Sequence, residues 1–238
     1  MKKYIFLSIL ALLVLGGCGQ TKPIPKEELK EKKTYKSLEE ALKEPEKVYK
    51  LDLSGKYLET FPKDILKFKN IQELNLSESL LKELPKEIGG LKKLELLCVG
   101  SLFLEKLPRE IGDLKNLKEL VIHADELKEL PKEIGNLVNL RGFCLWKSQL
   151  VDLPREIGKL KNLEMLALCL NQLNDLPREI GDLKNLKELV LWEYKLKKLP
   201  EEISNLDNLK ALDLKINTFS EEEKNRIKKL LPNTSIGF

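Results

Sequence analysis

Apolar residues recur along most of the chain with a fixed spacing. Between residues 48 and 219 the pattern LxxLxLxxxxLxxLPxxIxxLxN returns again and again with a constant period. The segment LxL alternates apolar and polar positions, which is typical of a short strand with one buried side. The proline and the isoleucine three positions later open a segment whose apolar spacing indicates a short helical turn. Each unit therefore predicts one strand and one helical return.

Proline marks the repeat most clearly, because its position number rises by 23 at every step: Pro62, Pro85, Pro108, Pro131, Pro154, Pro177 and Pro200. Seven units cover 48–70, 71–93, 94–116, 117–139, 140–162, 163–185 and 186–208, and a partial eighth runs from Leu209 to Phe219. The fixed φ of proline suits the first helical position, where its missing N–H costs nothing. In five units a glycine follows the isoleucine, and we expect it to permit a tight turn. Leu66 and Ser204 replace it in the first and seventh units.

A single unit cannot fold alone. Its seven or so inward apolar side chains contribute about 1.5–3 kcal/mol each on burial. Ordering the backbone costs about 1–2 kcal/mol per residue. Over the 23 residues of one unit, this cost exceeds the stabilisation from burial. Stacked units share strand hydrogen bonds and cover each other's apolar sides, so several are required.

This pattern resembles the leucine-rich repeat family over about residues 48–219. The resemblance implies an α/β solenoid with a curved parallel sheet on the concave face and short helical or 3₁₀ segments on the convex face. One departure concerns the position three places after the second strand leucine, where the family has asparagine. Here that position holds Lys56, Ser79, Leu102, Asp125, Ser148, Asn171, Tyr194 and Asn217. We expect looser turns at Leu102 and Tyr194, whose side chains cannot make the same hydrogen bonds.

Helical caps are predicted at both ends of the repeats, because a solenoid otherwise exposes its core. Residues 37–47 form the N-terminal cap and residues 220–238 the C-terminal cap. In each, a serine is followed three positions later by glutamate, which is a capping box. The pairs Ser37/Glu40 and Ser220/Glu223 predict helices over about 38–44 and 221–231.

The first residues have the pattern of an export signal. Lys2 and Lys3 precede an apolar run from Tyr4 to Leu15, which is shorter than the about 20 residues of a membrane span. The run ends in Leu-Gly-Gly-Cys18, which resembles the lipobox of bacterial lipoproteins, although Gly16 stands where alanine or serine is commoner. The resemblance implies that residues 1–17 are removed and that Cys18 carries acyl chains such as palmitate. An ordinary secretory signal with a coincidental cysteine is the alternative.

Residues 18–36 are rich in lysine, glutamate and proline, and they are predicted to be a tether behind the lipidated cysteine. A short helix over Lys26–Lys33 is the alternative. The lipobox and the repeats together resemble bacterial leucine-rich repeat lipoproteins, which implies a lipid anchor in the bacterial cell envelope. Gly19 is not aspartate, which by analogy favours the outer membrane and leaves surface or periplasmic orientation open.

Charge and composition exclude several functions. Forty-two basic and 38 acidic side chains give a net charge of +4, too small an excess for a dedicated nucleic-acid-binding protein. The chain has one histidine, and it lacks HExxH, a phosphate-binding glycine loop and G-x-S-x-G. We therefore expect neither an enzyme nor a cofactor.

The residues that alternate with the buried leucines face the concave side, and in the middle repeats they become apolar, aromatic and sulfur-bearing. The predicted partner-binding residues are Val121, His123, Cys144, Trp146, Met165, Ala167, Cys169, Val190, Trp192 and Tyr194. Trp146 and Trp192 occupy one column, about 10 Å apart. We expect both to stay exposed, whereas Leu166 and Leu189 are buried. Exposed aromatic side chains on a preformed surface are typical of protein binding.

Two alternatives for this face stay open. The side chains could simply cover a wide sheet, or a second copy could bury them. A disulfide between Cys144 and Cys169, or a zinc site of these cysteines with His123, is disfavoured, because each cysteine lies on a different strand without a CxxC pattern. Cys98, Cys144 and Cys169 are therefore expected to be free thiols in an apolar patch. The favoured function is a membrane-anchored module that recognises another, unidentified protein. The competing function is a structural or assembly component of the envelope that self-associates through the same face.

Overall fold

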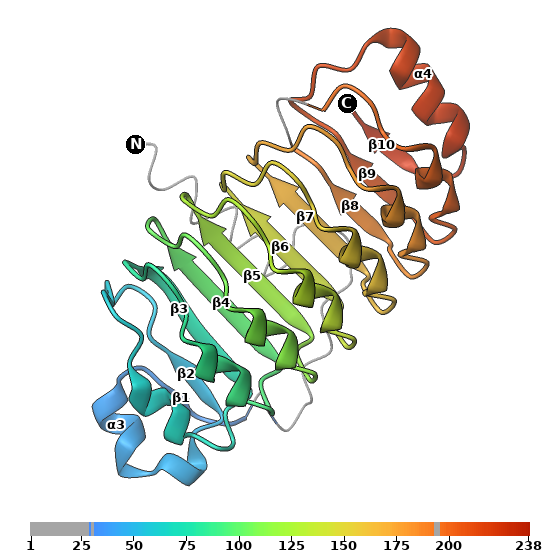
Figure 1. The fold of residues 1–238 in the computed structure, drawn as a ribbon. Coiled ribbons are helices and arrows are strands. Elements are labelled where there is room, and N and C mark those ends of the chain that lie inside the picture. The colour runs from blue at the N-terminus through green and yellow to red at the C-terminus, as the bar shows by residue number, and fades with distance from the viewer. Residues whose placement is uncertain (1–28, 30, 193–195) are drawn as a thin grey trace. The chain divides into compact units, whose positions relative to one another are not determined.

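Ten parallel strands follow one another in sequence order within a single sheet in the computed structural model of the protein (Figure 1). The structure describes Leu29, residues 31–192 and residues 196–238. Apart from Leu29 and Glu31, these residues belong to one compact unit, Lys32–Phe238. The strands are β1 (Thr34–Tyr35), β2 (Lys50–Asp52), β3 (Glu73–Ser79), β4 (Leu96–Ser101), β5 (Glu119–Ala124), β6 (Gly142–Trp146), β7 (Met165–Cys169), β8 (Glu188–Val190), β9 (Ala211–Asp213) and β10 (Ser235–Gly237).

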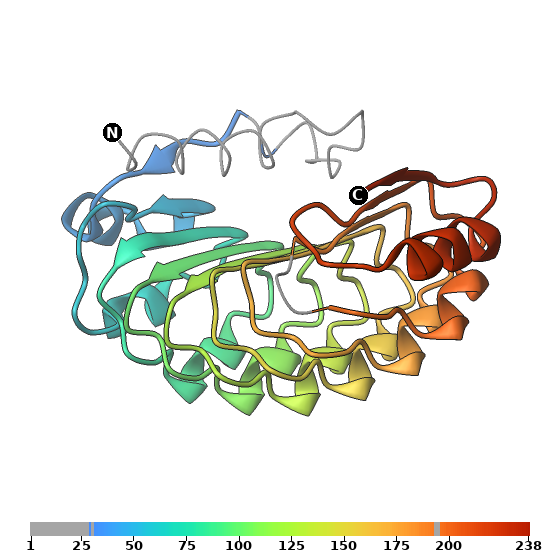
Figure 2. The same cartoon turned by 90° about the horizontal axis from the view of Figure 1, so that it is seen from above.

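Equivalent positions of successive repeats lie side by side in this sheet. Leu97 pairs with Leu120, and Leu120 pairs with Phe143, so each step to the next strand advances the sequence by one full repeat. The inward leucines therefore stack into one continuous core. Leu166 and Leu189 are both fully buried, as expected. The sheet is curved within this unit (Figure 2), and the predicted solenoid is confirmed.

Short 3₁₀ turns return the chain along the convex side, next to one another (Figure 2). They are η1 (Pro45–Lys47), η2 (Lys63–Lys67), η3 (Lys86–Gly90), η4 (Arg109–Asp113), η5 (Lys132–Asn136), η6 (Arg155–Lys159), η7 (Arg178–Asp182) and η8 (Glu201–Asn205). In η2–η8 the repeat proline lies just before the turn, in extended backbone, so the expected first helical position is wrong by one residue. The carbonyl of Pro85, for example, accepts the N–H of Ile88 at 3.0 Å. Proline suits this place because the turn needs its carbonyl and not an N–H.

The glycines of the convex turns are needed for a different reason from the one expected. The five that follow isoleucine are buried and do not have positive φ, so the turn itself does not demand glycine. A Cβ at Gly89 would lie 2.7 Å from the carbonyl oxygen of Glu110 in the next repeat. At Gly158 it would lie 2.6 Å from that of Glu179. Glycine is therefore required because neighbouring turns approach closely.

Asparagines at the end of each convex segment tie neighbouring repeats together. The side-chain amide of Asn139 donates to the carbonyl of Lys115, in the preceding repeat, at 2.7 Å. The equivalent bonds are made by Asn70, Asn116, Asn162, Asn185 and Asn208. Lys93 interrupts this ladder, and its ammonium group instead donates to the side-chain oxygen of Asn70 at 2.7 Å. The sequence showed the asparagine column but not its bonds.

A second polar ladder follows the carboxyl ends of the strands, at the position where the family has asparagine. The amide of Asn171 donates to the carbonyl of Cys169 at 3.2 Å. The equivalent amide of Asn217 donates to the carbonyl of Leu191 at 2.6 Å. Next to Leu102, the strand register shifts by one residue, and the hydroxyl of Ser101 donates to a backbone carbonyl at 2.7 Å. The Ser101 side chain thus makes the polar bond that Leu102 cannot make. Tyr194 lies outside the described residues.

Helices cap both ends of the sheet, as predicted: α3 (Leu38–Lys43) and α4 (Glu221–Leu230). The serine of each capping box accepts the N–H of the third residue beyond it, at 3.2 Å in α3 and 3.1 Å in α4. The glutamate side chains do not complete the boxes. Glu40 pairs with Lys33 at 2.7 Å. The nearly buried Glu223 accepts the N–H of Leu199 at 3.0 Å and pairs with Arg226 at 2.7 Å, so it joins α4 to the last repeats.

Two terminal strands were not expected from the sequence. Thr34 and Tyr35 fall in the predicted tether, yet they pair with β2, and Tyr35 is buried. This part of the tether prediction is wrong. Strands of two or three residues are too short to show an alternating pattern. Residues 18–28, with the predicted lipidation site Cys18, lie outside the described residues. In the part of the chain that the structure describes, no helix is long and apolar enough to cross a membrane.

Candidate functional site

The sheet places the predicted partner-binding residues next to one another on the concave face. One row crosses strands β5 to β8 and holds Val121, Cys144, Ala167 and Val190. A second row holds His123, Trp146 and Cys169, followed by Trp192 just beyond β8. Met165 lies on the adjoining row, beside Gly142. Nine of the ten residues are described and are brought together. We call Val121, Cys144, Trp146, Met165, Ala167, Cys169, Val190 and Trp192 the concave patch.

The two tryptophans pack against each other across one intervening strand. Their ring centroids are 6.2 Å apart, and the ring planes are nearly perpendicular. Strand spacing separates their Cα atoms by about 10 Å, so the rings lean together above Cys169, which is fully buried. Trp146 is only 5% exposed. The expectation that it stays exposed is therefore wrong, because edge-to-face packing with Trp192 covers it. Trp192 remains partly exposed.

Two thiols of the concave face, those of Cys98 and Cys144, are kept protonated by burial. Burial raises the pKa of both Cys98 and Cys144 to about 12. The sulfur atom of Cys144 lies 3.8 Å from that of Met165, and no disulfide joins Cys98, Cys144 and Cys169 to one another. A protonated thiol is a weak nucleophile and a weak metal ligand. Within the described ranges, no three His, Cys, Asp or Glu side chains form a possible metal site.

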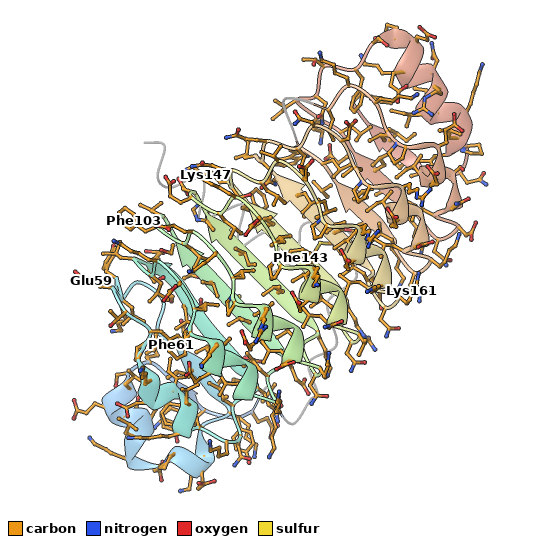
Figure 3. The ribbon with its side chains drawn as sticks, viewed as in Figure 1. Glu59, Phe61, Phe103, Phe143, Lys147 and Lys161 are labelled. Carbon is orange, nitrogen blue, oxygen red and sulfur yellow. The ribbon has the colours of Figure 1, made fainter. Side chains whose placement is uncertain are left out.

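His123 belongs to a polar cluster at the edge of the concave patch. Its Nε2 atom lies 3.2 Å from a carboxylate oxygen of Asp125, and the other oxygen lies 2.6 Å from the ammonium nitrogen of Lys147. Figure 3 shows Lys147 at the carboxyl ends of the strands. Burial lowers the pKa of His123, which leaves the imidazole neutral at pH 7. The predicted site residue therefore lies beside the carboxylate of Asp125.

Carboxylates border the patch along the row that includes Met165. Glu73 and Glu119 lie on either side of Leu96 in this row, and Glu188 lies beyond Met165. Burial, followed by repulsion from Glu73, raises the pKa of Glu119 to about 7. Burial also raises the pKa of Glu73 and of Glu188. The concave face therefore combines an apolar, aromatic floor with poorly hydrated carboxylates.

Further exposed apolar side chains lie along the carboxyl ends of the first strands. Tyr57 is 62% exposed, Leu102 48% and Phe103 46%, and Figure 3 shows Phe103 at this edge. Tyr57 and Phe103 were not predicted to take part in binding. A comparison of this position between repeats could have identified Tyr57 and Phe103, because later repeats place the polar residues Glu126, Gln149 and Gln172 there.

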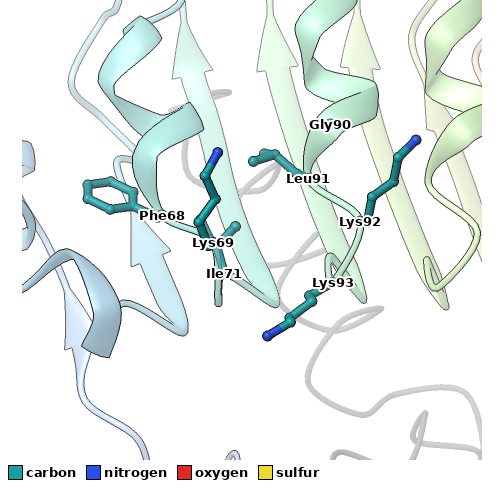
Figure 4. A pocket seen from close by; sticks show the side chains of 7 residues that line it. All are labelled: Phe68, Lys69, Ile71, Gly90, Leu91, Lys92 and Lys93. Atoms are coloured by element: carbon teal, nitrogen blue, oxygen red, sulfur yellow. The ribbon is translucent and has the colours of Figure 1, made fainter.

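A small pocket of about 120 Å³ lies between η2 and η3 on the convex side (Figure 4). It is lined by Phe68, Lys69, Ile71, Gly90, Leu91, Lys92 and Lys93. The lysine side chains point in different directions (Figure 4), and that of Lys69 donates to the carbonyl of Leu66 at 2.9 Å. Among the lining residues, Lys93 is the one that interrupts the asparagine ladder. The pocket is a local opening between two repeats, without converging polar groups.

The fold and the repeats agree with comparisons to known proteins. The family described as "leucine-rich repeat region" matches residues 47–141 and 128–232. An internalin C2 from Listeria monocytogenes has a TM-score of 0.67 at 21% identity, over 82% of this chain and 80% of that chain. Another L. monocytogenes internalin (inlF) has a TM-score of 0.53 at 20% identity, over 81% of this chain and 62% of that one.

A leucine-rich repeat protein from Leptospira interrogans is 26% identical, over 87% of this chain and all of that chain, with a TM-score of 0.38. No curated protein matches the sequence. Because the internalins share only about a fifth of their residues with this chain, their similarity shows the fold alone. The family match covers most of the sequence, including all seven full repeats. The chain therefore belongs to the leucine-rich repeat family.

Proposed function

We propose that this protein is a protein-binding module that uses its concave face and is held on the bacterial outer membrane by acyl chains on Cys18. The observation that carries the binding proposal is the concave patch. Equivalent positions in β2 and β3 are polar, such as Asp52 and Asn75, whereas β5 to β8 present apolar, aromatic and sulfur-bearing side chains. Apolar side chains therefore replace polar ones in the middle of the face, beginning with Leu96 and Cys98 of β4.

Trp192 is the residue best suited to contact a partner. It is partly exposed, and Trp146 supports it from one side. Its indole N–H is covered and has no acceptor among the described residues, so a small shift of the ring toward a partner's carbonyl group would satisfy it. A supported aromatic ring loses little conformational freedom on binding, which favours affinity. Because Trp146 is buried, its truncation also weakens the fold and makes a poorer test of binding.

Binding is tested with full-length protein immobilised and exposed to envelope and secreted extracts. Wild type is compared with Trp192→Ala and with Lys132→Glu, a charge change on the convex turn η5. Proteins retained by wild type and by Lys132→Glu, but lost with Trp192→Ala, support the proposal. Equal retention by all three refutes it. Sedimentation equilibrium tests the alternative: self-association that Trp192→Ala abolishes would assign this face to a second copy.

The anchor proposal rests on the N-terminal apolar run, the small residues that end it and Cys18. Cys18→Ala should prevent acylation and release the protein from membranes, since several acyl chains bind by about 0.8 kcal/mol per buried CH₂. Detergent-phase partitioning measures this directly. Cys98→Ala is the matched control and should partition as wild type does. Membrane retention of Cys18→Ala would contradict the anchor. Protease treatment of intact cells then separates surface from periplasmic orientation.

A further inference from the structure

We propose that the concave face binds a basic segment of its protein partner, with a lysine or arginine placed beside an apolar residue. This inference rests on the proposed function and adds the chemistry of the partner. The cation lies against Glu119, with Glu73 and Glu188 further along the same row. The apolar residue packs on the concave patch beside it.

The positions of the carboxylates favour this arrangement. Glu119 lies two strands from Glu73 and three strands from Glu188, or about 10 and 15 Å at the usual strand spacing. Between Glu119 and Met165 stands Gly142, where a Cβ would lie 3.8 Å from side-chain carbons of both neighbours. The missing side chain leaves Glu119 and Met165 next to each other, so one partner segment can meet a carboxylate and an apolar surface together.

Two of these carboxylates make no ion pair in the described part of the chain. Glu73 is paired with Lys50 at 4.0 Å, whereas neither Glu119 nor Glu188 makes a hydrogen bond or an ion pair with its side chain there. Lys118, which lies next to Glu119, is already paired with Glu95 at 2.8 Å. A carboxylate that is partly removed from water without a partner is costly, and a cation brought by another protein relieves that cost.

The charge of the face is opposite to the charge of the chain. The whole sequence carries +4, which alone suggests an acidic partner. On the described concave strands, however, the carboxylates of Asp52, Glu73, Glu119, Glu188 and Asp213 outnumber the ammonium groups, which are those of Lys50 and, just beyond β9, Lys215. Lys215 is also occupied, 3.0 Å from a carboxylate oxygen of Asp213. Local charge therefore selects a basic partner.

Proton linkage provides an independent signature. The charged groups that act on Glu119 are Glu73 on β3 and Lys118, which precedes it in the sequence. On the neighbouring strands, the thiols of Cys98 (β4) and Cys144 (β6) are protonated and carry no charge. A partner cation lowers the pKa of Glu119 from about 7, so binding at pH 7 releases up to about half a proton per molecule. Affinity should rise with pH, by at most about tenfold per unit below pH 7, and level off above it.

The probe is a phage-displayed library of random dodecapeptides, selected on the full-length protein. Selections are run in parallel on Glu119→Gln/Glu188→Gln and on Glu129→Gln/Asp175→Asn, which removes the same two charges from exposed positions outside the sheet. Binding of the selected peptides is measured by intrinsic fluorescence. The chain has two tryptophans, and both lie on the concave face. Circular dichroism confirms that each variant is folded.

We expect wild type and the control to enrich lysine or arginine next to apolar residues, and the concave variant to lose that enrichment. Affinity for wild type should fall about tenfold or more from pH 7.5 to pH 5.5 and become independent of pH in Glu119→Gln. Equal enrichment of basic residues by the concave variant, or no enrichment by wild type, would overturn the inference. If no selected peptide is weakened by Trp192→Ala, the proposed function itself fails. Trp192-dependent peptides without basic residues refute only this inference.

Discussion

Adjacent glycines in η3 provide a direct test of how the repeats pack. A Cβ at Gly89 would lie 2.7 Å from the carbonyl oxygen and 3.0 Å from the Cβ of Glu110, whereas a Cβ at Gly90 meets nothing within 4 Å. Replacing either glycine by alanine reduces the freedom of the unfolded chain, which stabilises by about 0.4–1 kcal/mol. Only Gly89→Ala adds an overpacking cost of about 1–3 kcal/mol, because the backbone of the next repeat must move.

Gly90→Ala should therefore be neutral or slightly stabilising, and Gly89→Ala should be destabilising by about 1–2 kcal/mol. Guanidinium unfolding of the two full-length variants, monitored by circular dichroism, measures the difference in the free energy of unfolding. Gly90→Ala is the matched control, since it lies one residue away in the same turn. Equal effects of the two substitutions, or a stabilising Gly89→Ala, would show that close approach of the turns does not explain the glycine column.

Four further substitutions have defined outcomes. Leu166→Ala should lower the free energy of unfolding by about 2–5 kcal/mol through lost burial and a cavity, and a loss below about 1 kcal/mol would contradict the strand register. Asn139→Ala should lower the free energy of unfolding by about 0.5–1.5 kcal/mol, because a hydrogen bond to the preceding repeat is lost, and Lys93→Asn should raise it by a similar amount. Both are measured by urea unfolding. No change in either variant would show that the asparagine ladder does not stabilise the fold. Glu119→Gln removes a carboxyl group whose pKa is raised to about 7 in the folded protein. Wild type therefore loses stability as pH rises from about 4.5 to 7, so the variant should be more stable by about 1–3 kcal/mol at pH 8 and unchanged at pH 4.

The period of the sequence predicted the sheet and the core, because both are specified by an apolar spacing that recurs in every repeat. The capping helices were predicted from the serine and glutamate of their capping boxes. Leu166 and Leu189 are buried for this reason. The short strands β1 and β10 were not predicted, because they pair with the end repeats without repeating their sequence. Tyr35 illustrates this: one buried aromatic residue in a charged segment has no periodic signal.

Positions on the concave face were predictable, but their environments were not. Alternation placed Trp146 and Trp192 in one column, whereas the packing of one ring on the other depends on side-chain rotamers that no pattern encodes. The raised pKa of Glu119 likewise depends on burial and on Glu73, two strands away. Gly89 was correctly singled out for the wrong reason, because the contact that excludes a side chain comes from the next repeat.

The central claim is that the concave face, and not the convex one, binds the partner. It is tested most directly by the dissociation constant of a captured partner, measured by calorimetry for Trp192→Ala and for Lys132→Glu under the same conditions. The account predicts at least about 30-fold weaker binding for Trp192→Ala, which corresponds to about 2 kcal/mol, and a change within about twofold for Lys132→Glu. Unchanged binding by Trp192→Ala together with a marked loss for Lys132→Glu would contradict it and place the partner on the convex face.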